Sequence, residues 1–293
     1  KSLRGWDYFG GSSKEDIEDN IDVLRQRSRD AYMGVPVATA SLKTMRTNVV
    51  AGGLIPAPSI DAEYLKLNDE QVQALQAQIV REFDLWADTP TCDADRVDNF
   101  YQLQQLAFLS YLMNGDTIAL LPMKQRAGQP YQLCIRLIEA DRVCSPDLQD
   151  RLFPMEVNII QGVETGEDGE VLAYWICNRH PLASLANQNG ALRWDRVEAH
   201  GKTGRRNVLH MMVRERAGQL RGVPLLAPVL EAIKQLGRYT DAEIMAAVIS
   251  AMFTVFIEPA GPTDSRPTGE IVRDGERVDD QDQTTIEMAT GAI

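Results

Sequence analysis

One stretch, RERAGQLRGVP at residues 214–224, separates two kinds of sequence pattern and decides the fold. It is basic and punctuated by glycine, with short strand-like segments before it and a long helical period after it. Arg214, Arg216 and Arg221 stand at this junction, and guanidinium groups pair well with carboxylates. The stretch is therefore either a charged surface connection or a loop that clamps carboxylates of an adjoining subunit.

A helical period follows this loop from Pro224 to Phe256, with one weak point at Gly237. A helix of this length would measure about 50 Å, at ~1.5 Å per residue. Its second half is apolar on more than one side. It also carries small residues that would let another helix approach closely, namely Ala242, Ala246, Ala247, Ser250 and Ala251. That neighbour could be a core helix of the same subunit or part of a second subunit.

Helical periods also fill the first part of the chain. They predict three helical segments, over 13–50, 68–88 and 98–113. The first is broken at Gly34 and Pro36, and the second is capped by Asn68. The apolar face of the first helix is predicted to hold Ile17, Ile21, Leu24, Ser28, Ala31 and Tyr32.

Short strands are predicted between these helices and the loop. Their ranges are 117–123, 131–138, 156–164, 171–177, 190–197 and 207–213, and the Asp-Gly pair at 168–169 is typical of a hairpin turn. The resulting fold class is α+β, with helices packed on a small antiparallel β barrel or sandwich, followed by the long helix.

Composition excludes several classes of protein. The chain has 293 residues, of which 44% are hydrophobic, so neither disorder nor a collagen-like repeat fits. It carries 30 basic and 42 acidic residues, a net charge of -12, which opposes sequence-independent adhesion to nucleic acid or anionic lipid. The apolar run at 244–257 is shorter than the ~20 residues that cross a bilayer, which favours a buried helix over a membrane anchor.

The last segment, residues 258–293, is acidic, with nine carboxylates against three arginines. Its weak pattern fits a short solvated domain or a mobile loop. The sequence stops without a helix cap or a charged final turn, and we expect it to be cut inside a domain.

Motifs for catalysis or cofactor binding are weak. Gly201-Lys202-Thr203 resembles the end of a phosphate-binding loop, but Arg196 stands where its first glycine belongs, and a strand follows. The three histidines, His180, His200 and His210, lack metal-ligand spacing, and the four cysteines form no CxxC pair. We therefore predict no cofactor, no metal and free thiols.

Glu139 and Asp141 are close enough in sequence to act as an acid/base pair. At a strand end, however, they are expected to bond nearby backbone or Arg142. Together with the missing nucleophile motifs, this predicts a protein that is not an enzyme.

Several short stretches, taken in order, make the sequence recognisable. They are LRQRSRD at 24–30, NVVAGGL at 48–54, Gly115-Asp116, IEADRV at 138–143, Gly162-Val163-Glu164 with Gly169, Ala173-Tyr174, Val208-Leu209-His210, and AGQLRGVP at 217–224 preceded by Arg216. With this order and spacing, the chain resembles the lambda-type family of tailed-bacteriophage portal proteins from about Trp6 to Glu258. The chain departs from the family at Ala51, where the family usually has glycine. This difference bears only on the geometry of the turn at that position.

The resemblance implies a ring of about twelve identical subunits at one capsid vertex. It also implies that the packaging motor, the terminase, drives double-stranded DNA through this ring and that the DNA later leaves through it. Residues 1–213 would then form the wing, 214–257 the loop and a long stem helix, and 258–293 the start of the clip. The rest of the clip, the second stem helix and the crown would be absent from this chain.

The resemblance also implies partners and a location. Besides the subunit itself, these are the terminase large subunit, the major capsid and scaffolding proteins, the head-completion or adaptor proteins, and translocating DNA bound without sequence specificity. No membrane is implied. The expected location is the portal vertex of the virion, and the host cytoplasm during assembly.

Two sets of residues are candidates for this role. Subunit contacts are assigned to Arg214, Arg216, Arg221, Ala242, Ala246, Ala247 and Ser250, and tunnel-facing positions to Glu231, Lys234, Arg238, Asp241 and Glu243. Two alternatives stay open: another phage connector or tail ring, which would share the acidity and the helix but not the ordered motifs, and an uncharacterised intracellular enzyme.

Overall fold

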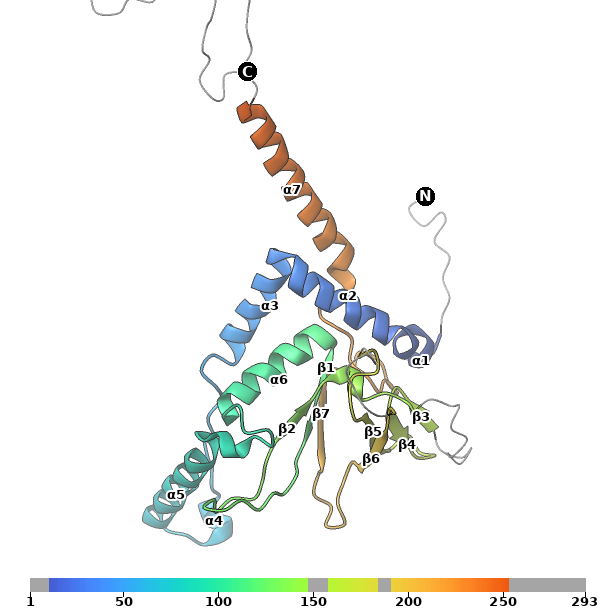
Figure 1. The fold of residues 1–293 in the computed structure, drawn as a ribbon. Coiled ribbons are helices and arrows are strands. Elements are labelled where there is room, and N and C mark those ends of the chain that lie inside the picture. The colour runs from blue at the N-terminus through green and yellow to red at the C-terminus, as the bar shows by residue number, and fades with distance from the viewer. Residues whose placement is uncertain (1–10, 147–157, 184–190, 253–293) are drawn as a thin grey trace, which may run out of the picture. The chain divides into compact units, whose positions relative to one another are not determined.

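Helices fill the first part of the chain, antiparallel strands the middle, and a long helix follows them (Figure 1). The computed structural model describes residues 11–146, 158–183 and 191–252. The chain divides into two units, residues 1–234 and residues 235–293. The expected clip at 258–293 lies outside the described residues.

The N-terminal helices are more broken than the sequence predicts. Their bounds are α1 Ser13–Asp16, the 3-10 turn η1 Glu18–Asn20, α2 Ile21–Gly34 and α3 Pro36–Val49. Ser12 caps α1 in a capping box with Glu15, but the helix stops after one turn, so the expected continuous helix from residue 13 is wrong. The break between α2 and α3 falls where Gly34 and Pro36 predict it, with Pro36 in the first turn of α3.

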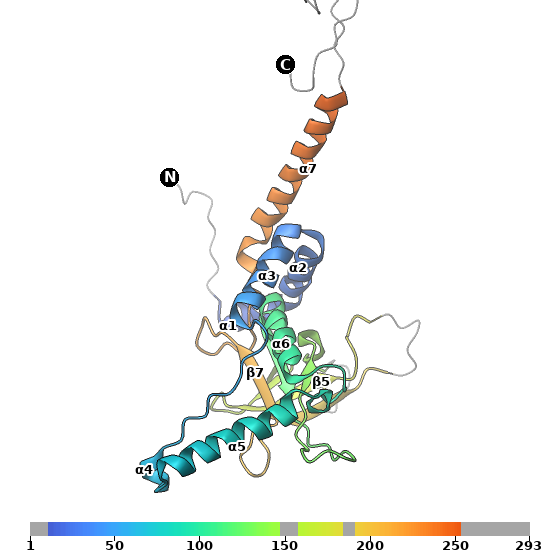
Figure 2. The ribbon, with the colours of Figure 1, turned by 90° about the vertical axis from the view of Figure 1, so that its left-hand side faces the viewer.

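The next helices begin at amide caps. Their bounds are α4 Ala62–Leu65, α5 Asp69–Ala87, the 3-10 turn η2 Pro90–Cys92 and α6 Phe100–Asn114. Asn68 and Asn99 each accept a hydrogen bond from the backbone N–H three residues on, which satisfies an otherwise unpaired donor. Figure 2 shows α5 extending away from the strands, with α4 at its far end, and only Ala87 of α5 is buried.

The strands form two antiparallel sheets. One has the order β2-β1-β7, from Arg136–Ile138, Asp116–Leu120 and Val208–Met212; the short turn η3 Ala140–Arg142 follows β2. The other has the order β3-β4-β5-β6, from Asn158–Ile160, Val163–Thr165, Val171–Cys177 and Trp194–Glu198. The first sheet pairs segments that lie far apart in the sequence, with Ile118 opposite both Ile138 and His210.

The sheets correct two predictions. Within the described residues the strands form two open sheets and not a closed barrel, because β7 pairs only with β1 and β6 only with β5. The expected strand at 156–164 is two short strands, since Gln161 and Gly162 both have positive φ and turn the chain sharply. Its residues 156 and 157 lie outside the described residues. The hairpin at Asp168-Gly169 is confirmed as the connection between β4 and β5.

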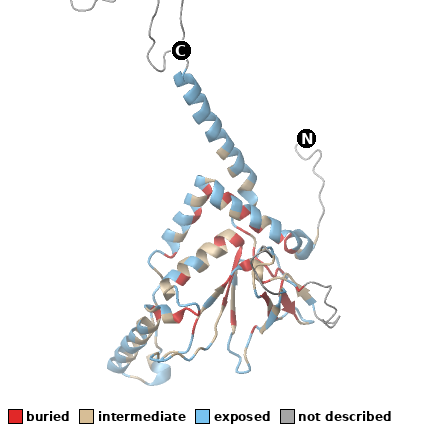
Figure 3. Cartoon of the chain, in the orientation of Figure 1, coloured by how far each residue is buried: buried red, intermediate tan, exposed pale blue. Residues whose placement is uncertain are grey.

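Two apolar clusters hold the first unit together (Figure 3). The first joins both sheets, with Ile118 and Ile138 from one sheet packed with Val163 and Ile176 from the other. The second lies among α2, α3 and α6, and Leu226, after the loop, is buried in it. The loop at 214–224 therefore runs between the two clusters.

The long helix, α7, spans Leu230–Met252 after the 3-10 turn η5 Ala227–Val229. It starts later than predicted, and residues 253–256 of the prediction lie outside the described residues. All residues of α7 belong to the described part of the chain, and none of them is buried. Across residues 11–146, 158–183 and 191–252, we find no helix that combines the length and apolar character of a membrane-crossing segment.

Candidate functional site

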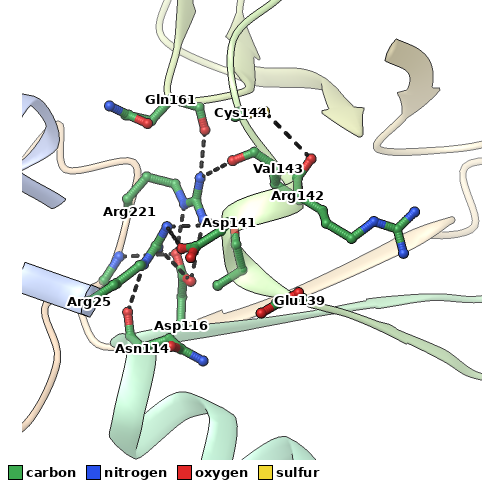
Figure 4. Close-up of polar contacts among 12 residues, drawn as sticks. Arg25, Asn114, Asp116, Glu139, Asp141, Arg142, Val143, Cys144, Gln161 and Arg221 are labelled. Atoms are coloured by element: carbon green, nitrogen blue, oxygen red, sulfur yellow. Dashed lines mark hydrogen bonds and ion pairs between the residues drawn. The ribbon is translucent and has the colours of Figure 1, made fainter. Parts of the chain in front are cut away.

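The loop at 214–224 is fastened to the interior of the first unit by Arg221. This side chain is fully buried, and each of its N–H groups meets an acceptor (Figure 4). Nε and Nη2 donate to the two oxygens of Asp116 at 2.7 and 3.4 Å. The remaining donors reach the backbone carbonyls of Val143 (2.7 Å), Gln161 (2.6 Å) and Ala140 (2.8 Å). Arg221 thus connects four segments of one subunit and has no capacity left for another.

Asp116 is the centre of this network. It is fully buried and also receives Arg25 Nη2 at 2.8 Å, His210 Nε2 at 3.3 Å and the backbone N–H of Gly222 at 3.3 Å. Burial opposes ionisation of Asp116, but the charges of Arg221 and Arg25 outweigh it and hold its pKa far below the usual range. Burial also lowers the pKa of Arg25 to about 10, and the charge of Arg221 acts in the same direction. Arg25 therefore stays charged near neutral pH, and Asp116 stays ionised.

The C-terminal end of α6 is capped by its own C-cap residue, Gly115, and by two other segments of the chain. The last four carbonyls of a helix lack partners within it. Here Gly115 N donates to Tyr111, Leu225 N to Leu112, Ser28 Oγ to Met113 and Arg25 Nε to Asn114, at 2.7–3.0 Å. Arg25 and Ser28 on α2, and the loop that precedes α7, therefore all depend on the position of this helix end.

Two glycines allow the backbone to cross at this point. Gly115 has a φ of 88°, and a Cβ atom there would lie 2.3 Å from the carbonyl oxygen of Gly222. A Cβ atom on Gly222 would lie 1.9 Å from the carbonyl oxygen of Gly115. No side chain fits at either position, so both glycines are required by contact between main chains.

The rest of the loop is shaped by two buried polar side chains. Gln219 accepts from the backbone N–H groups of Glu215 (2.8 Å) and Arg216 (3.1 Å) and donates to the carbonyl of Arg221 at 2.7 Å. Glu18 accepts from the N–H of Leu220 at 3.0 Å. The loop is therefore a built structure, and the interpretation of it as a plain surface connection is wrong.

The three arginines of the loop have different environments. Arg221 is buried, so the expected contact between it and an adjoining subunit is wrong. Arg216 is half-exposed and pairs with Asp16 of the same chain and with the carbonyl of Gly11. Arg214 is exposed and, within the described part of the chain, has no ion pair or side-chain hydrogen bond.

Glu139 and Asp141 lie at the edge of the network with His180. Their ligand atoms are within 4.8 Å of one another, a spacing that could hold a metal ion. Arg29 binds both carboxylates, however, and Arg25 Nη1 is 3.7 Å from Asp141 Oδ1. Guanidinium groups thus already supply the positive charge that a cation would bring.

The expected partner of these carboxylates is also corrected. The side chain of Arg142 donates to the carbonyls of Cys177 and Asn178 and not to the carboxylates of Glu139 or Asp141. His180 Nδ1 accepts from the N–H of Leu182, so its proton lies on Nε2 and is donated to Asp141 at 3.1 Å. This group is an internal ion cluster.

The other predicted site residues lie on α7. Among them, Ala242, Ala246, Ala247 and Ser250 are all exposed, as are Glu231, Lys234, Arg238, Asp241 and Glu243. At about 100° per residue, the first four charged side chains fall within an arc of roughly 80°, whereas Glu243 lies on the opposite side of the helix. The tunnel-facing set therefore does not share one face.

Sequence reasoning missed the centre of the network. Arg25 and Asp116 stand in short stretches of the family resemblance, and the sequence predicts no role for either; for His210 it excludes only a metal site. One signal was available: Arg25 stands four residues after Ile21 and three before Ser28, on the buried face of α2, where Leu24 was expected.

Comparisons with known proteins agree with the stretches that meet here. The family model described as "Phage portal protein, lambda family" matches residues 1–293. The portal protein of Escherichia phage N15 is 21% identical over 266 residues, 90% of this chain and 48% of that protein. Portal protein B of Escherichia phage lambda is 19% identical over 265 residues, with the same coverage. The chain spans about half the length of these curated relatives.

Among solved structures, a chain of the "Neck of empty GTA particle computed with C6 symmetry" is similar at a TM-score of 0.42 and 14% identity. The match covers 80% of this chain and 48% of that chain. At this TM-score the likeness carries no argument.

Proposed function

The chain belongs to the lambda family of phage portal proteins, and on this premise we propose that it is part of the subunit of a portal ring. The ring, of about twelve copies under closed symmetry, occupies one capsid vertex. Double-stranded DNA enters through it during packaging and leaves through it at ejection. The role is structural and not enzymatic.

The proposed layout follows the loop. Residues 1–213 form the wing, 214–257 the loop and a stem helix, and 258–293 the start of the clip. The support is that Arg221 ties the start of this second segment to Asp116 at the start of β1 and to η3. Asp116 in turn binds Arg25 of α2.

The exposed apolar surface of α7 is the observation that carries the proposal. Residues 244–252 contain no charged side chain, and Ile244 is 62%, Met245 59% and Met252 77% exposed. An uncharged helix segment of this kind is not stable in water alone and needs neighbours. In a ring, the same helix of the adjacent copies can supply them.

Small residues indicate where a neighbouring helix would approach. Ala242, Ala246 and Ser250 recur every four residues and so form one row, where backbones can come close. Ala247 flanks this row. Arg214, which is exposed, is the one arginine of the loop that we retain as a subunit contact; Arg216 is already paired with Asp16.

The charged side of α7 fits a surface that DNA passes without being held. Glu231 and Asp241 share it with Lys234 and Arg238, so that acids and bases balance. Tight binding to DNA requires several phosphate contacts by clustered lysines or arginines. We propose that these four residues face the tunnel, and that Glu243, on the other side, does not.

The proposed partners are the terminase large subunit, the major capsid and scaffolding proteins, and the head-completion proteins, besides DNA without sequence preference. The proposed location is the virion, with assembly in the host cytoplasm.

The test is the mass of the assembled full-length product, by native mass spectrometry and by class averages of single particles. Ala246→Phe should prevent ring closure and leave a folded monomer. Asp241→Phe is the matched control, because it adds the same ring about 140° away on the helix, and should assemble normally. Intact Ala246→Phe rings would defeat the interface assignment. A wild-type monomer or dimer under all conditions would favour an enzyme or adaptor, and a ring that fails to support packaging would favour another connector.

A further inference from the structure

A pocket of about 820 Å³ lies along one face of α5, the helix that Figure 2 shows extending away from the strands. Its lining follows the helix at spacings of three and four residues, and its wall at Pro58 is held by Gln76, whose Nε2 donates to that carbonyl at 3.1 Å. The other face of α5 is covered, because Phe83 and Trp86 pack on Phe100 at ring distances of 5.4 and 5.1 Å. Among the described residues, the pocket face is therefore the open side of this helix.

Carboxylates dominate the charge of this pocket. Asp84 and Asp88 line it one helical turn apart, about 6 Å along the axis. Arg81 is the cation among the described lining residues, and it already pairs with Glu82 at 3.4 Å. Asp84 accepts a hydrogen bond from the Tyr101 hydroxyl at 3.5 Å, and within the described ranges neither aspartate pairs with a cation. The pocket thus offers two negative charges that the subunit does not balance.

The hairpin between β6 and β7 carries the opposite charge at its tip. Gly204 N donates to the carbonyl of Gly201 at 2.9 Å and Gly201 N to that of Arg205 at 2.7 Å, and Gly204 has a φ of 77°, which glycine adopts readily. These bonds close a tight turn, with Lys202 and Arg205 on its two sides. Both side chains are exposed, and neither forms an ion pair or a side-chain hydrogen bond with a described residue.

The two charged surfaces lie apart in one subunit. Figure 1 shows α5 to the left of the sheet β2-β1-β7, whereas the hairpin tip extends below β7. The chain near the tip supplies no acid of its own: residues 199–214 include four lysines or arginines and no acidic residue, and Glu198, just before them, pairs with Arg196 at 3.7 Å. A protruding basic tip and a concave acidic pocket on different parts of one surface fit a head-to-tail contact, which joins two different patches of identical copies.

We propose that the hairpin tip of one copy docks in the α5 pocket of the next copy around the ring. The proposal rests on the proposed function and names the surfaces through which the proposed wings of adjacent subunits meet. The charges match in number and in scale, because Lys202 and Arg205 flank a turn whose ends lie within about 7 Å, and the two aspartates are about 6 Å apart. Lysine and arginine form charge-assisted hydrogen bonds with carboxylates, and salt screens such pairs less in a pocket than on an open surface. Each copy offers one tip and one pocket, so the contact can repeat until the ring closes.

Charge reversal tests this contact in the full-length product, by native mass spectrometry and sedimentation velocity at about 0.15 M salt. The tip reversal is Lys202→Glu with Arg205→Glu, and the pocket reversal is Asp84→Lys with Asp88→Lys. None of these four side chains is buried, so both variants should unfold at the wild-type urea concentration. Each reversal should raise the protein concentration at which half of the chains are in rings by about tenfold or more, because like charges then face one another.

Combining the two reversals restores opposite charges. A chain that carries all four substitutions should form rings at the wild-type concentration. A mixture of the two reversed proteins should also form rings, of alternating copies, because the tip of each then meets an oppositely charged pocket on the other. Arg27→Glu with Lys43→Glu is the matched control, since it makes the same change in net charge at exposed positions of α2 and α3, and should assemble as wild type.

The outcomes separate this contact from the ring itself. Wild-type rings that both reversals leave unchanged, or that the combined variant fails to restore, would overturn the contact. A tip reversal that assembles normally but no longer retains a DNA duplex would assign the hairpin tip to nucleic acid and would overturn the contact as well. A wild type that forms open head-to-tail chains with the same charge dependence would support the contact and defeat the closed ring, whereas a wild type that stays monomeric at all concentrations would overturn both.

Discussion

Asp116→Asn should destabilise the first unit more than any exposed charge change. The substitution keeps the size of the side chain but leaves Arg25 and Arg221 buried without their shared anion. Each contact, at 2.7–2.8 Å, is worth about 6 kcal/mol of gross attraction at an effective dielectric constant of ~20. Desolvation and the repulsion between the two arginines offset part of this attraction. Removing one partner of a buried ion pair typically lowers the free energy of unfolding by about 3–5 kcal/mol. We expect a loss in that range.

The loss should depend on pH in a defined direction. The folded pKa of Asp116 lies far below its unfolded value of about 3.9. Its contribution to stability is therefore complete above the unfolded pKa and declines as the pH falls below about 4. The difference in unfolding free energy between wild type and Asp116→Asn should be constant from pH 7 to about 5 and should shrink towards pH 3.

Urea unfolding followed by tryptophan fluorescence measures the difference in unfolding free energy between the two proteins. The protein concentration is kept low enough that the protein is monomeric. Asp195→Asn is the matched control, because it breaks an exposed pair with Arg193 and should cost less than about 1 kcal/mol. Arg25→Met combined with Asp116→Asn should recover part of the loss, since one of the two uncompensated charges is removed. A loss below about 1 kcal/mol for Asp116→Asn, or a difference that is the same at pH 3 and pH 7, would refute this account of the network.

Three further outcomes follow from the same structure. Gly222→Ala should lower the free energy of unfolding, measured from urea midpoints, by about 3 kcal/mol or more, because its Cβ would overlap the Gly115 backbone. Gly34→Ala is the control: a Cβ there meets nothing within 4 Å, and the change should stay within about 0.5 kcal/mol. Equal effects of the two substitutions would contradict the close crossing of the main chains at Gly115 and Gly222. Asn99→Ala should cost about 1 kcal/mol in the same assay, through loss of the α6 cap, and an unchanged midpoint would argue against that cap. Burial raises the pKa of the Cys92 and Cys144 thiols to about 11. At pH 8 both should therefore react with Ellman's reagent about 100-fold more slowly than a free thiol, and urea should remove this difference. Fast labelling of these two cysteines in the native protein would count against their burial.

Local patterns predicted the elements whose stability is local. The cap at Asn68, the break at Gly34 and Pro36, and the hairpin at Asp168-Gly169 are all confirmed, because each depends on side chains and backbone within a few residues. Strand pairing is not local: several short strands of similar character can combine in more than one order. The sequence therefore allowed either a barrel or a sandwich, and the described strands form two open sheets and no closed barrel.

The site could not be predicted for a related reason. An arginine is usually exposed, and the pairing of guanidinium groups with carboxylates predicts that Arg221 contacts an adjoining subunit. Its partners are an aspartate 105 residues earlier and three backbone carbonyls, and a carbonyl leaves no mark in a sequence. The short stretches that carry the family resemblance do contain the residues of this network. Arg25, Asp116, Val143, His210 and Arg221 belong to five of those stretches, and they meet in one place.

The capping of α6 by α2 and by the loop before α7 sets an order of events during synthesis. The end of α6 leaves the ribosome long before Arg221, which follows Asp116 by 105 residues. At roughly 5–20 residues per second, this interval is on the order of 5–20 s. During that time Asp116 and the last carbonyls of α6 have no access to the loop, and Arg25 can hold only one side of the junction. The first half of the nascent chain must therefore wait in an incomplete form, and it closes only when the segment that leads into α7 arrives.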